Sequence, residues 1–197
     1  MKESIGILKS EHRSISAVLL GLKHLAEMAQ DASVKPDFAV FRSMLRYIDE
    51  YPERLHHPKE DEHLFARLVR RFPGARKLID GLKEEHLQGA KLIRELERRL
   101  MLFEEGWPQG AAEFLGSVNA YADFHWKHMR KEETELVPLA EKHLTVDDWR
   151  AIDRAFGANE DPIAQIEERD FQRLFSRIAS LAPAPVGLGD PWKKVVN

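Results

Sequence analysis

The segment at residues 56–64 reads HHPKEDEHL, and the segment at residues 128–136 reads HMRKEETEL in the same register. Each segment contains a histidine that is followed four residues later by a glutamate: His56 with Glu60, and His128 with Glu132. Four residues make about one turn of an α-helix, so both side chains of each pair point to the same side of one helix. The repeat therefore predicts two helices that carry the same pair of polar side chains.

Two shorter repeats accompany these segments. Glu-His dipeptides occur at Glu11–His12 and at Glu85–His86, in separate parts of the chain. One histidine–glutamate pair could arise by chance, but two pairs together with two dipeptides indicate a metal site assembled from four helices.

The composition limits the kind of protein and the kind of metal site. A chain of 197 residues suits one domain with a sizeable core, or one domain with a modest extension. The charged fraction of 32% exceeds the roughly 25% of average proteins, which fits amphipathic helices with solvated outer faces. There is no cysteine, which excludes disulfides and thiolate ligands, so any metal must use histidine nitrogen and oxygen.

The charge pattern and the apolar pattern argue against two classes of partner. The net charge is -3, from 30 basic and 33 acidic residues that are interleaved, so we expect binding to neither nucleic acid nor anionic membranes. The first residues lack the apolar core of a signal peptide, and no apolar run approaches the roughly 20 residues needed to cross a bilayer. We therefore expect a cytoplasmic protein.

Apolar residues recur at helical spacing in four long segments. The predicted helices cover residues 5–28, 37–69, 75–103 and 109–142. Asp37 is a candidate N-cap of the second helix, and Pro52 and Pro58 predict a kink or a short break within it. Because the connections are short, the pattern predicts an all-α, up-down-up-down four-helix bundle over residues 1–144.

Residues 145–197 follow a different pattern. Thr145 and Asp148 predict the N-terminal cap of a short helix that ends near Gly157, and a further helix is predicted at residues 163–181. The Pro- and Gly-containing tail at residues 182–191 should be extended or poorly ordered. We expect this C-terminal helical extension to pack against the bundle, or against a second copy of the chain in a homodimer.

Every predicted helix of the bundle supplies candidate metal ligands. They are His12, His56, His57, Glu60, His86, His128 and Glu132. Burying these groups unpaired would be costly, whereas two divalent cations would neutralise the carboxylates and keep the imidazoles neutral. Asp61 and Glu133 point about 100° away from the glutamates that precede them, so we expect them to support the ligands or to face solvent. His24, His63 and His143 do not fit the pattern and are expected at the surface.

The ordered set resembles that of hemerythrin-like (HHE cation-binding) domain proteins. The resemblance covers residues 5–143 and rests on the two Glu-His dipeptides and on residues 56–65 and 128–140. It implies a hemerythrin-like bundle with two iron ions in a non-haem di-iron centre. The terminal ligands would be His12, His56, His86 and His128, and the bridging carboxylates would be Glu60 and Glu132. Imidazole and carboxylate also accept zinc and manganese, so neither metal is excluded.

One feature of the family is missing from this sequence. Oxygen-carrying members place two histidines one turn apart on the third helix, whereas Leu82 and Ala90 stand one turn on either side of His86. A ligand is therefore missing from that ion, which argues against simple reversible oxygen carriage. His57 could replace it, because iron-sensing members use a ligand directly after the second-helix histidine. His125 on the fourth helix is the alternative, and we favour His57.

The resemblance implies three functions of different classes. The first is a protein that binds or senses dioxygen, a related small diatomic or peroxide ligand, or iron itself. The second is a di-iron oxidase or peroxidase for a small substrate, which would need an access channel and a proton-delivering residue. The third is a bundle held by a purely structural metal, for which closed coordination would be expected. The residues alone leave open whether the protein is an enzyme.

Overall fold

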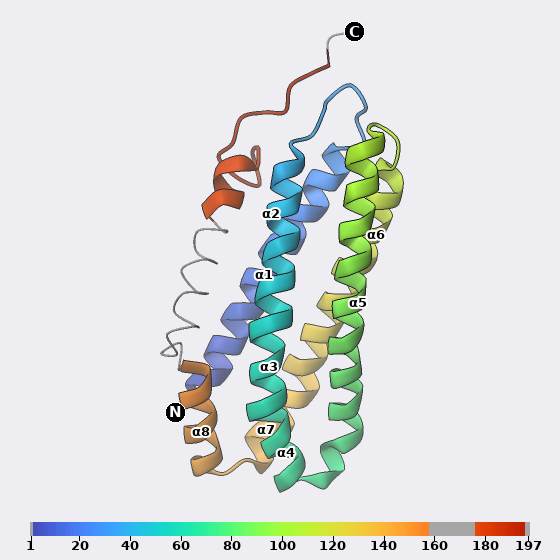
Figure 1. Cartoon of the computed structure of the whole chain (residues 1–197). Coiled ribbons are helices and arrows are strands. Elements are labelled where there is room, and N and C mark those ends of the chain that lie inside the picture. Colours follow the sequence, from blue (N-terminus) through green and yellow to red (C-terminus); the bar gives the residue numbers. More distant parts are fainter. Residues whose placement is uncertain (1, 158–175, 196–197) are drawn as a thin grey trace.

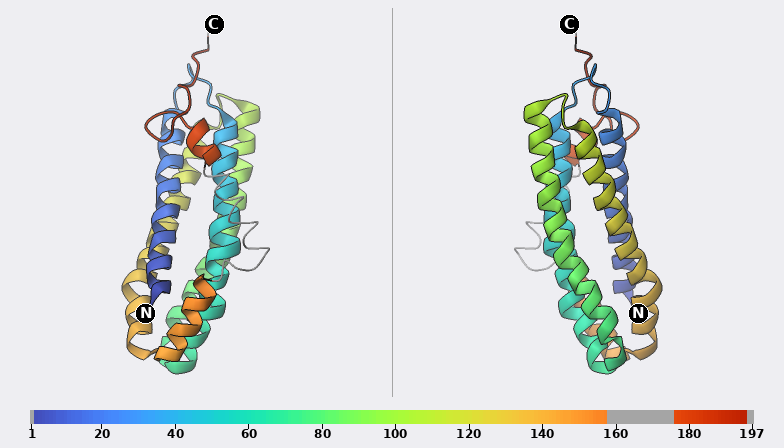
Figure 2. Two further views of the ribbon diagram at one scale, coloured as in Figure 1. Left: turned by 90° about the vertical axis from the view of Figure 1, so that its left-hand side faces the viewer. Right: turned by 90° about the vertical axis from the view of Figure 1, so that its right-hand side faces the viewer.

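A computed structural model of the chain describes residues 2–157 and 176–195. Within these ranges the chain is helical apart from turns, loops and two isolated β-bridges, which confirms the predicted all-α class. Four long helical rods lie along one another and give the molecule an elongated shape (Figures 1 and 2). No helix in the described ranges combines the length and the apolar character needed to cross a membrane.

The four rods follow one another along the sequence. The first rod is α1 (Glu3–Met28). The second is a continuous helical run made of α2 (Phe38–Ile48), η1 (Asp49–His56), α3 (His57–Lys59), η2 (Glu60–Phe65) and α4 (Ala66–Arg71). After the short turn η3 (Pro73–Ala75), the third rod is α5 (Arg76–Gly106), and the fourth combines α6 (Ala111–Lys131), η4 (Glu132–Leu136) and α7 (Val137–His143). Both α1 and α5 contact α2 and α6, so the rods surround a common interior.

The predicted helices are present at the expected places, with ends that differ by a few residues. Asp37 caps the second rod as predicted, because its side chain accepts a hydrogen bond of 2.8 Å from the backbone N–H of Ala39. This bond satisfies one of the N–H groups that the first turn of a helix leaves without a partner.

The second and fourth rods depart from regular α-helix at three places. η1, η2 and η4 are π-helical, and prolines lie inside or beside them: Pro52, Pro58 and Pro138. A proline has no N–H to donate, so the regular α-helical hydrogen bonding cannot continue through it. The kink or short break predicted at Pro52 and Pro58 is therefore present as wide helical turns, and the second rod continues through both prolines. Glu60 and Glu132 are the first residues of η2 and η4, and π-helical turns are often found at functional sites.

The buried apolar side chains form two separate clusters. The upper core lies toward the top of Figure 1 and includes Leu22, Phe41, Ile93, Phe103 and Phe114. The lower core lies at the end where α4, α7 and α8 meet and includes Leu8, Phe65, Ile79, Leu136 and Trp149. Each cluster supplies the burial of apolar surface that stabilises one half of the bundle.

A layer of buried polar residues separates the two cores. On α1, His12 lies between Leu8 of the lower core and Ile15 of the upper core. His86 holds the corresponding place on α5, because it follows Leu82 of the lower core and precedes Ile93 of the upper core. The fold therefore sets the candidate ligands inside the bundle and away from both of its ends.

The extension begins with α8 (Val146–Gly157), which packs on the lower core through Trp149, Ile152 and Phe156. The predicted cap is confirmed, since the backbone N–H of Asp148 donates to Thr145 Oγ1 at 3.2 Å and the backbone N–H of Thr145 donates to Asp148 Oδ2 at 3.0 Å. The helix predicted at residues 163–181 falls largely outside the described residues, and its last part, residues 176–181, is helical.

The tail packs at the opposite end of the bundle, against the upper core (Figure 1). Trp192 lies 6.0 Å from Phe41 between ring centroids, and Val186 contacts α1 beside Gly21, where an added Cβ would lie 2.9 Å from Val186 Cγ1. The tail therefore docks on the bundle, with turns and bends at residues 182–189 that differ from the extended or poorly ordered segment predicted, and with a β-bridge between Lys194 and Val34. The division of the chain at residues 144 and 145 stays a prediction.

The attachment of α8 predicts a pH-dependent stability. Burial alone raises the pKa of Asp148, but hydrogen bonds from Arg71 and Thr145 outweigh burial and hold the pKa well below its ordinary value of 3.8. A carboxylate with a lowered pKa stabilises the folded protein above its unfolded-state pKa, and this stabilisation is lost as the pH falls toward the folded-state pKa. Asp148→Asn should therefore cost about 1–3 kcal/mol at pH 7, and progressively less below about pH 4.

Urea unfolding at pH 7 and at pH 3 measures this difference. Asp147→Asn is the matched control, because the Asp147 side chain is 85% exposed and forms a 3.0 Å ion pair with the exposed Arg150. A cost for Asp148→Asn that is the same at both pH values would contradict the assignment.

Candidate metal centre

The predicted ligands converge in the polar layer between the two cores. They come from all four rods: His12 on α1, His56 on η1, His57 on α3, Glu60 on η2, His86 on α5, His128 on α6 and Glu132 on η4. All seven are buried, and Glu60 and Glu132 have no exposed surface. The sequence repeat thus produces one compact cluster inside the bundle.

A first donor set consists of His12, His56, Glu60 and Glu132, with one donor atom from each lying within 4.8 Å of the others. His12 Nε2 lies 3.1 Å from His56 Nε2 and 3.3 Å from Glu132 Oε2. His56 Nε2 lies 3.6 Å from Glu60 Oε1. This set joins α1 to the second and fourth rods.

A second donor set consists of Glu60, His86, His128 and Glu132. His86 Nε2 lies 3.6 Å from Glu60 Oε2 and 3.7 Å from Glu132 Oε1. His128 Nε2 lies 3.3 Å from Glu132 Oε1. Each glutamate therefore presents one carboxylate oxygen to each donor set, which is the arrangement needed to bridge two metal ions.

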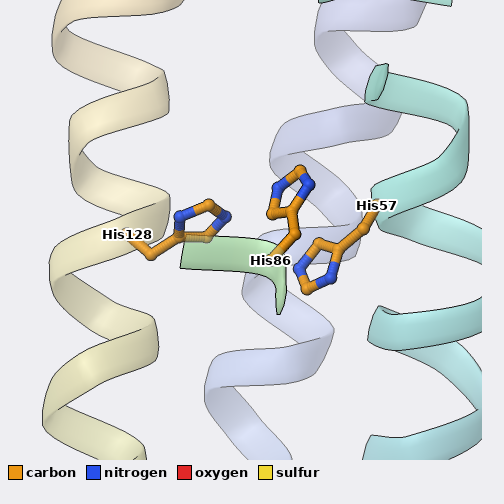
Figure 3. Close-up of side chains that lie close together, drawn as sticks. All are labelled: His57, His86 and His128. Carbon is orange, nitrogen blue, oxygen red and sulfur yellow. The ribbon is translucent and has the colours of Figure 1, made fainter. Parts of the chain in front are cut away.

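The structure brings His57, and not His125, together with the second set. One donor atom each from His57, His86 and His128 lie within 4.8 Å of one another, and Figure 3 shows the three rings gathered between their helices. The His57 ring stacks on His86 with 4.0 Å between centroids. His125 belongs to none of these groups, and its Nε2 lies 3.9 Å from Glu53 Oε1. The geometry therefore favours His57 over His125 as the extra donor.

A carboxylate stands behind each of the five histidines, on its Nδ1 side. Three pairs are hydrogen-bonded at 2.8 Å: His12 with Glu133, His56 with Glu11, and His128 with Glu85. Two more pairs lie at 3.3 Å: His57 with Glu53, and His86 with Asp61. Histidines that bind metals commonly donate their other N–H to such a partner, which fixes the orientation of the ring.

These outer pairs repeat between the two halves of the bundle. Glu11 holds His56 and accepts a hydrogen bond of 2.9 Å from Lys59 Nζ. In the other half, Glu85 holds His128 and accepts a hydrogen bond of 2.7 Å from Lys131 Nζ. The two halves of the bundle therefore contain the same unit. In each unit, a helix with a Glu-His dipeptide pairs with a helix that carries the repeated histidine, lysine and glutamate.

The tautomers of these histidines follow from their partners. A carboxylate only accepts hydrogen bonds, so the Nδ1 of His12 and the Nδ1 of His56 each carry the proton. In neutral rings each Nε2 then has a lone pair, and these two nitrogens face each other at 3.1 Å. Two lone pairs at that distance repel, and a cation between them removes the repulsion. The first donor set is therefore built to receive a positive charge.

The electrostatics of the glutamates lead to the same conclusion. Burial and the neighbouring charge of Glu132 raise the pKa of Glu60 well above its ordinary value of 4.5. Burial also acts to raise the pKa of Glu132, but the charge of His128 and the nearby ring nitrogens of His12 and His86 hold it well below that value. Two carboxylates this close cannot both stay charged without compensation. A bound cation would supply that compensation.

The second donor set holds a proton when no cation is present. Burial acts to lower the pKa of His128, but Glu132 and Glu85 outweigh burial and raise the pKa to about 9. The ring is therefore protonated at neutral pH, and a metal ion must displace that proton to bind Nε2.

Buried polar atoms that lack a hydrogen-bond partner show whether these residues suit a bound metal. Both carboxylate oxygens of Glu60 and of Glu132 are buried without a hydrogen-bond partner, and so are the Nε2 atoms of His86 and His128. Leaving such groups buried and unpaired costs several kcal/mol. The separations of 3.1–3.7 Å among the donors suit ligands that share one ion at bond lengths of about 2.1 Å. The residues fit a pair of bound cations.

The sequence interpretation missed the buried cluster beside His57. Tyr121 and His125 are buried there beside the Glu53 side chain, which is 7% exposed. Gly89 leaves room for Glu53, because an added Cβ would lie 2.9 Å from Glu53 Oε1. The signal was present, since Glu53 precedes His57 by one helical turn. Asp61 and Glu133 support His86 and His12 as expected, and His24, His63 and His143 lie half-buried and outside the donor sets.

Comparison with known families identifies a match over most of the chain. The family model of the hemerythrin HHE cation-binding domain matches residues 3–140, a range that contains both donor sets. None of the curated proteins matches the chain. The resemblance inferred from the sequence motifs is confirmed.

The placement of His57 predicts a difference between two buried histidines. His57→Ala removes the donor that lies beside His86 and His128. Loss of a residue that only supports a ligand typically lowers metal affinity by about 10–100-fold. Loss of a ligand should lower the affinity of the variant by at least that factor. His125→Ala should keep the affinity of the wild type. Competition of each protein with a chelator for Fe²⁺, followed by metal analysis, measures the two effects. If His125→Ala lost metal while His57→Ala retained it, the choice of donor would be wrong.

Proposed function

The chain belongs to the hemerythrin HHE cation-binding domain family, and on that premise we propose that it is a non-haem di-iron protein. Its function in this proposal is to bind or sense a small oxidant, such as dioxygen, nitric oxide or peroxide, or to report the availability of iron. The observation that carries the proposal concerns Glu60 and Glu132: each glutamate presents one carboxylate oxygen to the first donor set and its other oxygen to the second.

In this proposal the two glutamates bridge the ions and the histidines complete the two coordination shells. His12 and His56 are the terminal ligands of the first ion, and His57, His86 and His128 are those of the second. The first ion thus has four protein donors and the second has five. Since iron commonly takes six ligands, the first ion keeps more room for an exogenous molecule.

The chain's own residues prepare the site for a small ligand. The carboxylates behind the histidines keep each ring in one tautomer and hold its other nitrogen toward the centre. The upper and lower cores exclude bulk water from both ends of the layer. When bound, the iron ions supply the redox chemistry, which the protein tunes through ligation and burial.

Two other functions remain as alternatives. A purely structural metal would be expected in a closed site, and the unequal donor sets argue against closure at the first ion. A di-iron oxidase or peroxidase would require access for a substrate to the same ion, and zinc or manganese would fit the same donors. A cytoplasmic location, the absence of nucleic-acid partners and a homodimer formed through the extension stay predictions.

The visible absorption spectrum separates these functions. We expect protein that is loaded with Fe²⁺ under anaerobic conditions to gain a visible absorption band when dioxygen, nitric oxide or peroxide is added. Irreversible bleaching with turnover of an added substrate would favour the enzyme, and an unchanged spectrum would favour a structural metal. Glu60→Ala should lose the response along with its iron. Glu135→Ala should keep the response, because Glu135 is exposed and lies outside the donor sets.

A further inference from the structure

A groove on the surface leads toward the first donor set. It lies between α1 and the fourth rod and has a volume of 410 Å³. Its lining includes Arg13, Leu20, Trp126, Met129 and Arg130, with His12 and Glu133 also contributing. Pockets of this size commonly hold small organic molecules.

The groove reaches the outer edge of the candidate centre through His12. The Nε2 of His12 faces His56 and Glu132 inside the bundle, and its Nδ1 is hydrogen-bonded at 2.8 Å to Glu133, which also lines the groove. A molecule in the groove would therefore lie beside the half of the centre that has fewer protein donors.

The walls of the groove combine an apolar surface with the guanidinium groups of two arginines. Leu20 is 57% exposed, and Trp126 and Met129 add an aromatic ring and a thioether. The guanidinium groups of Arg13 and Arg130 form no ion pair, side-chain hydrogen bond or ring contact with the residues that the structure describes. Arg46, in contrast, forms a 2.8 Å pair with Glu50.

The charges in the groove favour an anion. Two arginines and one glutamate line it, and the carboxylate of that glutamate, Glu133, is already bonded to His12. Arginine recognises carboxylates through paired N–H groups, and Trp126 offers a surface for a planar apolar body. We propose that this groove binds a small aromatic carboxylate, whose ring lies on Leu20 and Trp126 and whose carboxylate pairs with Arg13 and Arg130.

Binding in the groove requires no metal, but its consequence rests on the proposed function. If the first ion is the open one, a carboxylate bound beside His12 and Glu133 controls the approach of small molecules to that ion. The groove would then supply the access that an enzyme or a sensor of this kind needs.

Titration calorimetry with benzoate tests the proposal on the full chain, both metal-free and iron-loaded. We expect benzoate to bind in both forms, and the double variant Arg13→Gln with Arg130→Gln to bind at least about 10-fold more weakly. Arg94→Gln is the matched control, since the Arg94 side chain is exposed on α5 and donates a hydrogen bond to the Ala90 carbonyl of its own helix. Acetate, which lacks the ring, and benzyl alcohol, which lacks the charge, should each bind at least about 10-fold more weakly than benzoate.

Three results would overturn the proposal: no benzoate binding, equal binding by the double variant, or equal binding of acetate. The iron content of the same samples keeps the two proposals apart. Protein that binds benzoate but no iron would refute the di-iron function and support the proposed groove site. Protein that binds iron but no benzoate would refute the groove site and leave the di-iron function unaffected.

Discussion

The burial of four carboxylate oxygens against imidazole nitrogens, between two apolar cores, is the constraint on which the rest of the molecule depends. Glu60 and Glu132 have no exposed surface, and none of their oxygens has a hydrogen-bond partner. A layer of this kind opposes folding unless a positive charge enters it. The upper and lower cores hold the rods in place around the layer, and a cation pair would remove its cost.

The arrangement of the rods follows from this requirement. Each half of the bundle supplies one Glu-His dipeptide and one segment with a histidine, a lysine and a glutamate, and the halves meet at the shared carboxylates. The π-helical turns that begin at Glu60 and Glu132 occur in both halves at the same position. His57 breaks the repeat, because Met129 holds the corresponding place in the other half. In the proposed centre this one difference would give the second ion one donor more than the first, and the groove with Arg13 and Arg130 lies beside the first donor set.

Much of the fold and the site could be predicted from the sequence, because both depend on the spacing of residues that are close together in the chain. The helices followed from the apolar periodicity, and the donors followed from the one-turn spacing of His56 with Glu60 and of His128 with Glu132. The choice between His57 and His125 could not be made in this way, since both lie on inward faces and only the relative rotation of two rods separates them. The role of Glu53 and the docking of the tail on Phe41 likewise depend on contacts between distant segments.

Anomalous diffraction at the iron edge, from crystals of the iron-loaded protein, tests the central claim most directly. The account predicts two iron peaks in the polar layer, one on either side of the pair formed by Glu60 and Glu132, with His12 and His56 at one ion and His57, His86 and His128 at the other. A single peak, or iron bound outside the layer while Glu60 and Glu132 contact each other without an ion, would contradict it.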